Sequence, residues 1–215
     1  MGNCNVAIFD LDGTLHYTEK ALVPAIRMAM TDLGFPPALP EDINALYGEP
    51  LEVFCKTLLD DSVDNCTAFH EGIRRYQKNT LPESGELYPG IHQMLQEISE
   101  LGFTLAICSN AGMEYIELVT DSLGIRKMFS MILGRDGHAS KTNRIKEIMR
   151  RTGSHLAVMV GDRYHDIEAA FENGIQSIGC AYGYGKQEEM DKADFFVNSP
   201  SEITEILRKL LEKQT

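Results

Sequence analysis

The stretch at positions 6–15 reads VAIFDLDGTL, an unbroken apolar run that turns abruptly into an acidic segment containing glycine. A short apolar run without polar alternation is typical of a strand that is covered on both faces of its sheet. Similar runs recur along the chain, separated by segments with helical spacing, which favours β-α-β units and a mostly parallel sheet. The strands that we predict are 6–11, 104–109, 130–133, 156–161, 177–181 and 195–197.

Apolar residues with helical spacing fill the intervals between the later strands. Gly102, Gly124 and Gly174 follow three of these segments, and glycine is the residue that most readily ends a helix. We predict an α/β fold in which a Rossmann-like parallel sheet lies between two helical layers. The helices predicted for these layers are 91–101, 113–123, 143–151, 167–173 and 201–212.

The segment 16–84 departs from this alternation because it contains no strand-like run. Helical patterns separated by turns rich in Pro, Gly and Asp predict helices at 22–33, 41–46, 51–59 and 63–79, and the residues PESG at 82–85 are typical of a linker. We therefore predict two domains. The core domain comprises 1–15 and 85–215, and a helical cap domain, 16–84, is inserted between its first two strands.

The composition excludes several classes of protein. The chain has 215 residues with 20 Lys+Arg against 32 Asp+Glu, a formal charge of −12, and such acidity argues against a nucleic-acid partner. No apolar stretch is long enough to span a membrane, and the N-terminus has no features of a signal peptide, so we predict a cytoplasmic protein. The five cysteines form no C-x-x-C pair, and we expect reduced thiols rather than disulfides or a zinc site.

Polar residues that could take part in catalysis or ligand binding cluster where the predicted strands end, which is where open α/β sheets bind ligands. They are Asp10, Asp12 and Gly13 after the first strand, Ser109 and Asn110 after the second, Lys141 at a helix start, and Asp162 with Asp166 after the fourth strand. Carboxylates that converge on one sheet edge repel each other unless a cation lies among them, and oxygen ligands suit Mg²⁺. We predict that Asp10, Asp162 and the main-chain carbonyl of Asp12 bind Mg²⁺.

The same residues indicate a reaction. A carboxylate nucleophile, Asp10, beside a second carboxyl group that donates and accepts a proton, Asp12, is the arrangement for an aspartyl-phosphate intermediate. Gly13 allows the backbone to turn sharply and approach a bound anion. The Ser109 hydroxyl and the Lys141 ammonium group would stabilise the anionic transition state. The predicted chemistry is phosphoryl transfer.

The motifs at 10–14 (DLDGT), 109–110 (SN), Lys141 and 161–166 (GDRYHD) occur in an order that resembles the haloacid dehalogenase superfamily over almost the whole chain. The position of the helical insertion is similar to the subfamily that contains phosphoglycolate phosphatases, β-phosphoglucomutases and small pyrophosphatases. The chain departs from that pattern at Thr142, at Arg163 and at 16–18, where HYT replaces an Asp-Ser pair. These departures concern the identity of the substrate rather than the chemistry.

The resemblance implies a role for each residue. Asp10 would be the nucleophile and Asp12 the general acid and base. Mg²⁺ would be held by Asp10, Asp12 and Asp162, and Asp166 would support the metal site without being a ligand itself. Lys141 would act in catalysis by holding the phosphoryl group, and the phosphate-binding residues would be Ser109, Asn110, Gly13 and Thr14. The implied function is a Mg²⁺-dependent phosphatase that hydrolyses a small phosphorylated metabolite, as a monomer or homodimer.

Two alternatives stay open at this stage. A phosphomutase on the same scaffold would pass the phosphoryl group to a sugar, and a phospho-acceptor module like a receiver domain would be phosphorylated without turnover. A receiver domain has no use for a large insertion after its first strand. For the basic residues Arg74, Arg75 and Lys78, we interpret the pattern as a solvated helix face, and a site for a distal anion of the substrate is the alternative.

Overall fold

The computed structural model describes residues 4–47, 49, 51–59, 63–137 and 139–213. Within this part of the chain, the strands form one parallel sheet in the order β3-β2-β1-β4-β5-β6. The strands are β1 (Cys4–Phe9), β2 (Phe103–Gly112), β3 (Met131–Arg135), β4 (Ser154–Gly161), β5 (Gln176–Cys180) and β6 (Phe195–Val197). Each lies at a predicted position, so the α/β fold with a parallel sheet is confirmed.

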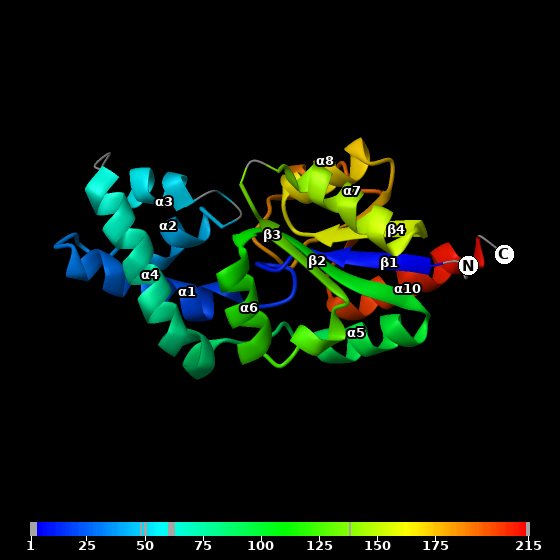
Figure 1. Cartoon of the computed structure of the whole chain (residues 1–215), viewed down its shortest axis with the longest axis horizontal. Helices are drawn as coiled ribbons and strands as arrows, with labels where there is room; N and C mark the ends of the chain where they lie inside the picture. The colour runs from blue at the N-terminus through cyan, green and yellow to red at the C-terminus, as the bar shows by residue number, and fades with distance from the viewer. Residues whose placement is uncertain (1–3, 48, 50, 60–62, 138, 214–215) are drawn as a thin grey trace.

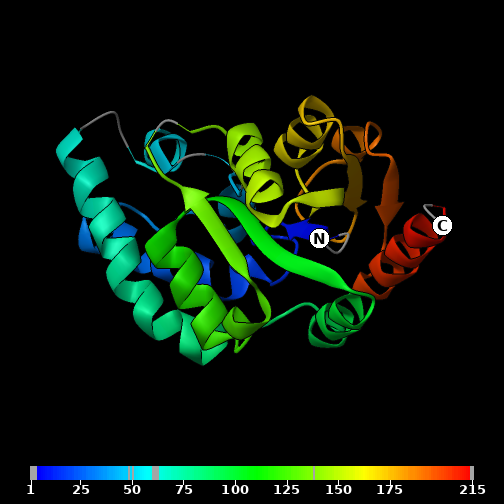
Figure 2. The same ribbon diagram turned by 45° about the vertical axis from the view of Figure 1, so that its right-hand side comes forward.

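Helices cover both faces of the sheet because both faces of β1 are apolar (Figure 1). Ala7 and Phe9 face the cluster formed with α5 (Ile91–Glu100), α6 (Met113–Ser122) and α10 (Pro200–Glu212). Val6 and Ile8 face the cluster formed with α7 (Lys141–Thr152) and α8 (Tyr164–Glu172). The helices α10 and α5 pack side by side although they lie at opposite ends of the core sequence (Figure 2). The short helices η1 (Arg126–Met128) and α9 (Gln187–Met190) were not predicted.

The helical insertion lies between β1 and β2 and projects beyond the carboxyl ends of the strands (Figure 1). It contains α1 (Thr18–Asp32), α2 (Pro40–Asn44), α3 (Leu51–Leu58) and α4 (Val63–Ser84). The long helices α1 and α4 pack against each other around Ile26, Phe69 and Ile73, which are almost completely buried. The insertion therefore has a hydrophobic core separate from those of the sheet.

The last helix of the insertion is longer than predicted. We expected 82–85 to be a linker, but α4 continues through Pro82 to Ser84. Proline removes one helical hydrogen bond, and the turn nevertheless persists because Thr80 and Leu81 are buried and the N–H of Gly85 donates to the Leu81 carbonyl at 2.8 Å. Packing thus outweighs the local preference of the sequence.

Two segments that connect the insertion to the core run beside each other. The Tyr17 N–H donates to the Glu86 carbonyl at 2.9 Å, and the Tyr88 N–H donates to the Leu15 carbonyl at 3.1 Å. The rings of Tyr17 and Tyr88 contact each other with their centroids 4.0 Å apart and their planes tilted by 45°. The chain therefore leaves and re-enters the core at one place.

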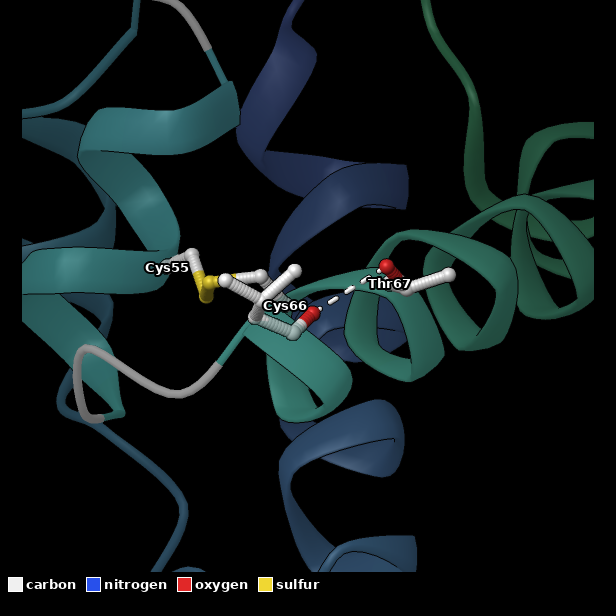
Figure 3. Close-up of a disulfide and its surroundings, with 4 residues drawn as sticks. Cys55, Cys66 and Thr67 are labelled. Atoms are coloured by element: carbon white, nitrogen blue, oxygen red, sulfur yellow. Dashed lines mark hydrogen bonds between the residues drawn. A yellow bond between two sulfur atoms is a disulfide. The ribbon is translucent and has the colours of Figure 1, made fainter.

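A disulfide joins Cys55 in α3 to Cys66 in α4, so the expectation that all thiols are reduced was wrong (Figure 3). The two Cα atoms are 5.4 Å apart. The sequence did not reveal this bond because it arises from the packing of two helices, not from a short cysteine motif. Thr67, beside Cys66, donates from its hydroxyl to the Val63 carbonyl within the first turn of α4.

No helix in the described ranges combines the length and the apolar character that a membrane crossing requires.

Candidate active site

Three buried carboxylates meet at the carboxyl edge of the central strands. Asp10 follows β1, Asp162 follows the neighbouring β4, and Asp166 lies in the first turn of α8. One oxygen of each carboxylate lies within 4.8 Å of the others. The structure therefore brings Asp10 and Asp162 together and adds Asp166, which we had expected to stand behind the ligands.

Lys141, the first residue of α7, supplies positive charge to this cluster. Its Nζ donates to Asp10 Oδ1 at 2.7 Å and forms an ion pair with Asp166. Ser140 caps the helix, accepting the Asn143 N–H at 3.2 Å, and so fixes where the Lys141 side chain begins. Burial alone would lower the pKa of Lys141, but Asp10 and Asp166 raise it, and the ammonium group stays charged.

The cluster fits a divalent cation. Burial raises the pKa of Asp10 to about 7, with Lys141 opposing and Asp166 adding to the rise. Burial also raises the pKa of Asp162 well above its usual value, and the charges of Asp10 and Asp166 act in the same direction. The carboxylates are thus short of positive charge, and their oxygen atoms are the donor type that Mg²⁺ prefers. Asp10, Asp162 and Asp166 could hold such an ion.

Gly13 and Thr14 lie beside the carboxylate of Asp162. Gly13 has φ +72°, and a Cβ atom there would lie 2.3 Å from Asp162 Oδ2. The Thr14 hydroxyl, completely buried, donates to Asp162 Oδ1 at 3.3 Å, and the Tyr184 N–H donates to Oδ2 at 2.7 Å. Both residues therefore help to position a carboxylate of the cluster, and the expectation that they bind phosphate stays a prediction.

Asp12 stands apart from the cluster, and its side chain is held by three hydrogen bonds. Tyr115 Oη at 2.6 Å, Thr18 Oγ1 at 3.0 Å and His16 Nε2 at 3.0 Å all contact Asp12 Oδ1. Burial would raise the pKa of Asp12, but the bonds from His16, Tyr115 and Thr18 outweigh it and keep the pKa below the usual value. No hydrogen bond from a described residue reaches Oδ2, which leaves that oxygen for a substrate.

Ser109 and Asn110 lie near the end of β2, and an arginine that the sequence analysis did not identify holds them in place. The Arg144 guanidinium, from α7, donates to the Ser109 carbonyl at 3.2 Å and to Asn110 Oδ1 at 2.7 Å. The Ser109 hydroxyl accepts the Ala111 N–H at 3.2 Å. These contacts hold the last residues of β2 in place at the edge of the sheet.

A cavity of about 360 Å³ lies between this edge and the insertion. Asp10, Asp12, Ser109, Lys141 and Asp166 form part of its wall, together with Asn110. The insertion closes the opposite side with residues of α1, α3 and α4. The predicted catalytic carboxylates therefore face a space between the core and the insertion that is large enough for a small organic ligand.

A model of the family described as "Haloacid dehalogenase-like hydrolase" matches residues 7–180. The chain belongs to this family. The hydrolase is 30% identical to a protein named phosphoglycolate phosphatase from Vibrio parahaemolyticus, over 93% of this chain and 94% of the relative. It is 29% identical to a protein named probable phosphatase IndB from Dickeya dadantii, over 96% and 95% of the two chains. The predicted resemblance to the superfamily is thus confirmed.

The fold of the hydrolase also matches solved structures. A predicted phosphoglycolate phosphatase from Haemophilus somnus superposes with a TM-score of 0.87, at 23% identity, over 96% of this chain and 99% of the other. This agreement covers the sheet and the insertion together, and it supports the cap-bearing form of the fold.

Some residues of this hydrolase's site gave no recognisable signal in the sequence. Tyr115 lies 103 positions from its partner Asp12, and Arg144 lies 34 positions from Asn110. Tyr184, which positions Asp162 through its main chain, follows β5 in a loop that carried no motif. His16, which contacts Asp12, is different because it lies in the segment 16–18, where the sequence departs from the pattern that it resembles.

The basic residues of α4 divide between two faces. Arg74 and Lys78 line the cavity of the hydrolase, whereas Arg75 forms an ion pair with Asp32 of α1 and does not line the cavity. All three side chains are exposed, as expected for a solvated helix face, and Arg74 and Lys78 also line the cavity.

Proposed function

We propose that the chain is a Mg²⁺-dependent phosphatase that hydrolyses a small phosphorylated metabolite through an aspartyl phosphate on Asp10. The observation that carries this proposal is that two carboxylates face the same cavity and are each held by different partners. Asp10 is bound to Lys141 within the acidic cluster, and Asp12 is held separately by Tyr115, Thr18 and His16. Such a division supports one nucleophile and one proton carrier.

In the first half of the reaction, an Asp10 carboxylate oxygen attacks the phosphorus atom of the ester. The bond from phosphorus to the leaving oxygen breaks. That oxygen takes a proton from Asp12, which enters this half-reaction protonated on Oδ2, and departs as an alcohol. The free Oδ2 of Asp12 is suited to this transfer because Oδ1 is already engaged. Lys141 and the Ser109 hydroxyl would hold the phosphoryl oxygens as negative charge spreads over them.

In the second half, a water molecule gives a proton to Asp12 and attacks the phosphorus atom of the aspartyl phosphate. The bond from phosphorus to Asp10 breaks, which releases inorganic phosphate and restores both carboxyl groups. The insertion would exclude bulk water from the cavity while this intermediate exists. We assign the core to 1–15 and 85–215 and the cap to 16–84, with the paired connections near Leu15 and Tyr88 as the division between them.

Mg²⁺ would be held by Asp10, Asp162 and the main-chain carbonyl of Asp12, with Asp166 beside them, and would offset the negative charge of the phosphoryl group. The curated relatives named as phosphoglycolate phosphatases support a phosphorylated organic acid as the substrate class. We propose no nucleic-acid or membrane partner, and a monomer or homodimer as the working form.

The test is phosphate release from p-nitrophenyl phosphate and 2-phosphoglycolate, with Mg²⁺ and with EDTA. We expect turnover that requires Mg²⁺ and that the variant Asp10→Asn abolishes. Asp42→Asn, at an exposed position of α2, is the matched control and keeps its activity. Phosphate release by Asp10→Asn at the rate of the unmodified protein would refute the proposal. Isomerisation of a sugar phosphate without release of phosphate would favour a mutase instead.

A further inference from the structure

The side of the cavity that faces away from the carboxylates is largely apolar. Leu22 and Ile26 lie one helical turn apart on α1, and Ile73 of α4 is also on this wall. Phe54 of α3 and Leu118 of α6 complete it. Because apolar wall area is best covered by an apolar ligand, these side chains favour a leaving group with a carbon body rather than a heavily hydroxylated one.

The size of the cavity leads to the same conclusion. Its volume is about 360 Å³. An apolar cavity of roughly 150 Å³ is enough to hold benzene. A two-carbon leaving group such as glycolate would leave most of the apolar wall in contact with water, so the cavity has room for a body of the size of an aromatic ring.

One face of α4 adds polar groups to this apolar wall. Ile73, Arg74, Gln77 and Lys78 recur at the spacing of one helical face, and all line the cavity. Gln77 is 6% exposed, yet its amide makes no hydrogen bond with any described residue. Its amide is therefore free to form a hydrogen bond with a ligand group in the cavity.

The charges near Gln77 favour an anion. Three cations on the wall already have carboxylate partners: Lys78 with Glu114 at 3.9 Å, Arg135 with Glu52 at 3.6 Å and Arg163 with Glu49 at 3.6 Å. Arg74 is exposed and lines the cavity, it forms no ion pair or hydrogen bond with any described residue, and it lies one turn from Gln77. Together Arg74 and Gln77 offer a positive charge and an amide donor, which suits a carboxylate.

We propose that the substrate is a phosphomonoester whose leaving alcohol has an apolar body larger than two carbons and a carboxylate at its far end, bound by Arg74 and Gln77. This proposal rests on the proposed phosphatase function, because the phosphate end is assigned to the site around Asp10. It names a larger and more apolar acid than 2-phosphoglycolate. Arg74 and Gln77 are then residues that determine specificity, not residues that perform the reaction.

The test compares kcat/KM for 4-carboxybenzyl phosphate, benzyl phosphate and 2-phosphoglycolate in the presence of Mg²⁺. The first compound has both the ring and the carboxylate, and each of the others lacks one of the two. We expect 4-carboxybenzyl phosphate to exceed each of them by at least about tenfold, a factor typical of one buried ring or one hydrogen bond to a charged group.

The variant Arg74→Gln removes the charge from the proposed carboxylate site. We expect it to abolish the preference for 4-carboxybenzyl over benzyl phosphate, and this ratio does not depend on how much of the enzyme is folded. Arg75→Gln is the matched control on the same helix, and it keeps the preference because Arg75 pairs with Asp32.

The possible failures are distinguishable. A kcat/KM for 2-phosphoglycolate at or above that for 4-carboxybenzyl phosphate, or an unchanged preference in Arg74→Gln, would overturn the inference and leave the phosphatase proposal standing. The absence of phosphate release from every compound, including p-nitrophenyl phosphate, would overturn the proposed function and this inference with it.

Discussion

The substitution Gly13→Ala tests whether the absence of a side chain at position 13 is what allows Asp162 to lie in the acidic cluster with Asp10 and Asp166. Gly13 has φ +72°, a conformation that L side chains rarely adopt, and an added Cβ would lie 2.3 Å from Asp162 Oδ2 and 2.6 Å from Tyr184 Cδ2. Real Cβ atoms are essentially never closer than 3.0 Å to another heavy atom. The new methyl group must therefore displace Asp162 from the acidic cluster.

Gly124→Ala is the matched control, because Gly124 has φ +71° and its added Cβ would meet nothing within 4 Å. Both variants incur the backbone cost of the left-handed conformation, about 1–2 kcal/mol in the free energy of unfolding. We expect Gly124→Ala to show this cost alone, with unchanged kcat. Urea denaturation and steady-state phosphate release measure the two quantities on the same samples.

For Gly13→Ala we expect the additional loss of function. A displacement of about 1 Å in a positioned catalytic group lowers the rate by roughly a hundredfold, and a moved Asp162 should also raise the Mg²⁺ concentration needed for half-maximal activity. Gly13→Ala with the kcat and the Mg²⁺ dependence of the unmodified enzyme would refute the reasoning, because Asp162 would then not depend on the missing side chain.

Three further predictions concern other parts of the molecule. Lys141→Gln leaves Asp10 and Asp166 without their buried partner and removes the charge that would hold the phosphoryl oxygens. Loss of one such group typically lowers kcat by about a hundredfold to a thousandfold, so we expect a fall of at least about a hundredfold. Lys146→Gln, exposed on the same helix, should keep its rate, and equal rates in the two variants would contradict the role of Lys141. Reduction of the Cys55–Cys66 disulfide, which spans 11 positions, should lower the free energy of unfolding by up to about 3 kcal/mol. The double variant Cys55→Ala/Cys66→Ala is the control, and the reductant should not change its free energy of unfolding. A loss of stability in that variant on reduction would show that the effect has another cause. The hydrogen bonds from Arg150 and Arg151 lower the pKa of Glu147 to about 2, so their stabilising effect is complete above its usual pKa of 4.5 and is lost as the pH falls towards 2. An NMR titration of the Glu147 carboxyl should show this midpoint, moved upward in Arg150→Gln; a midpoint near 4.5 in the unmodified protein would exclude the shift.

The sheet was predictable because its signal is local. Each buried strand is a short apolar run, and the residue that follows it is placed at the sheet edge by the chain itself, as Asp10 and Asp162 are. The four-residue spacing from Asp162 to Asp166 likewise lets one strand end and one helix turn bring two carboxylates together. The linker prediction failed because tertiary packing overrode a local preference: Pro82 and the residues around it favour a linker, but burial of Leu81 keeps them helical.

The remaining features of the site depend on contacts between distant segments. Tyr115 reaches Asp12 because α6 begins where β2 ends, and β2 lies beside β1 in the sheet. No pattern in either segment predicts this hydrogen bond. The Cys55–Cys66 disulfide depends in the same way on how α3 meets α4. The closeness of Gly13 to the carboxylate of Asp162 depends on the pairing of β4 with β1, which carries Asp162 to the same edge of the sheet.

The central claim is that the phosphoryl group is transferred to Asp10. The most direct measurement is acid quenching during turnover, reduction of the acyl phosphate with borohydride, and peptide mass spectrometry. We predict conversion of the Asp10 side chain to that of homoserine in a sample quenched with substrate and Mg²⁺, and no conversion at Asp12 or in a sample without substrate. Phosphate release in the same reaction with Asp10 unmodified, or conversion at a different carboxylate, would contradict the account.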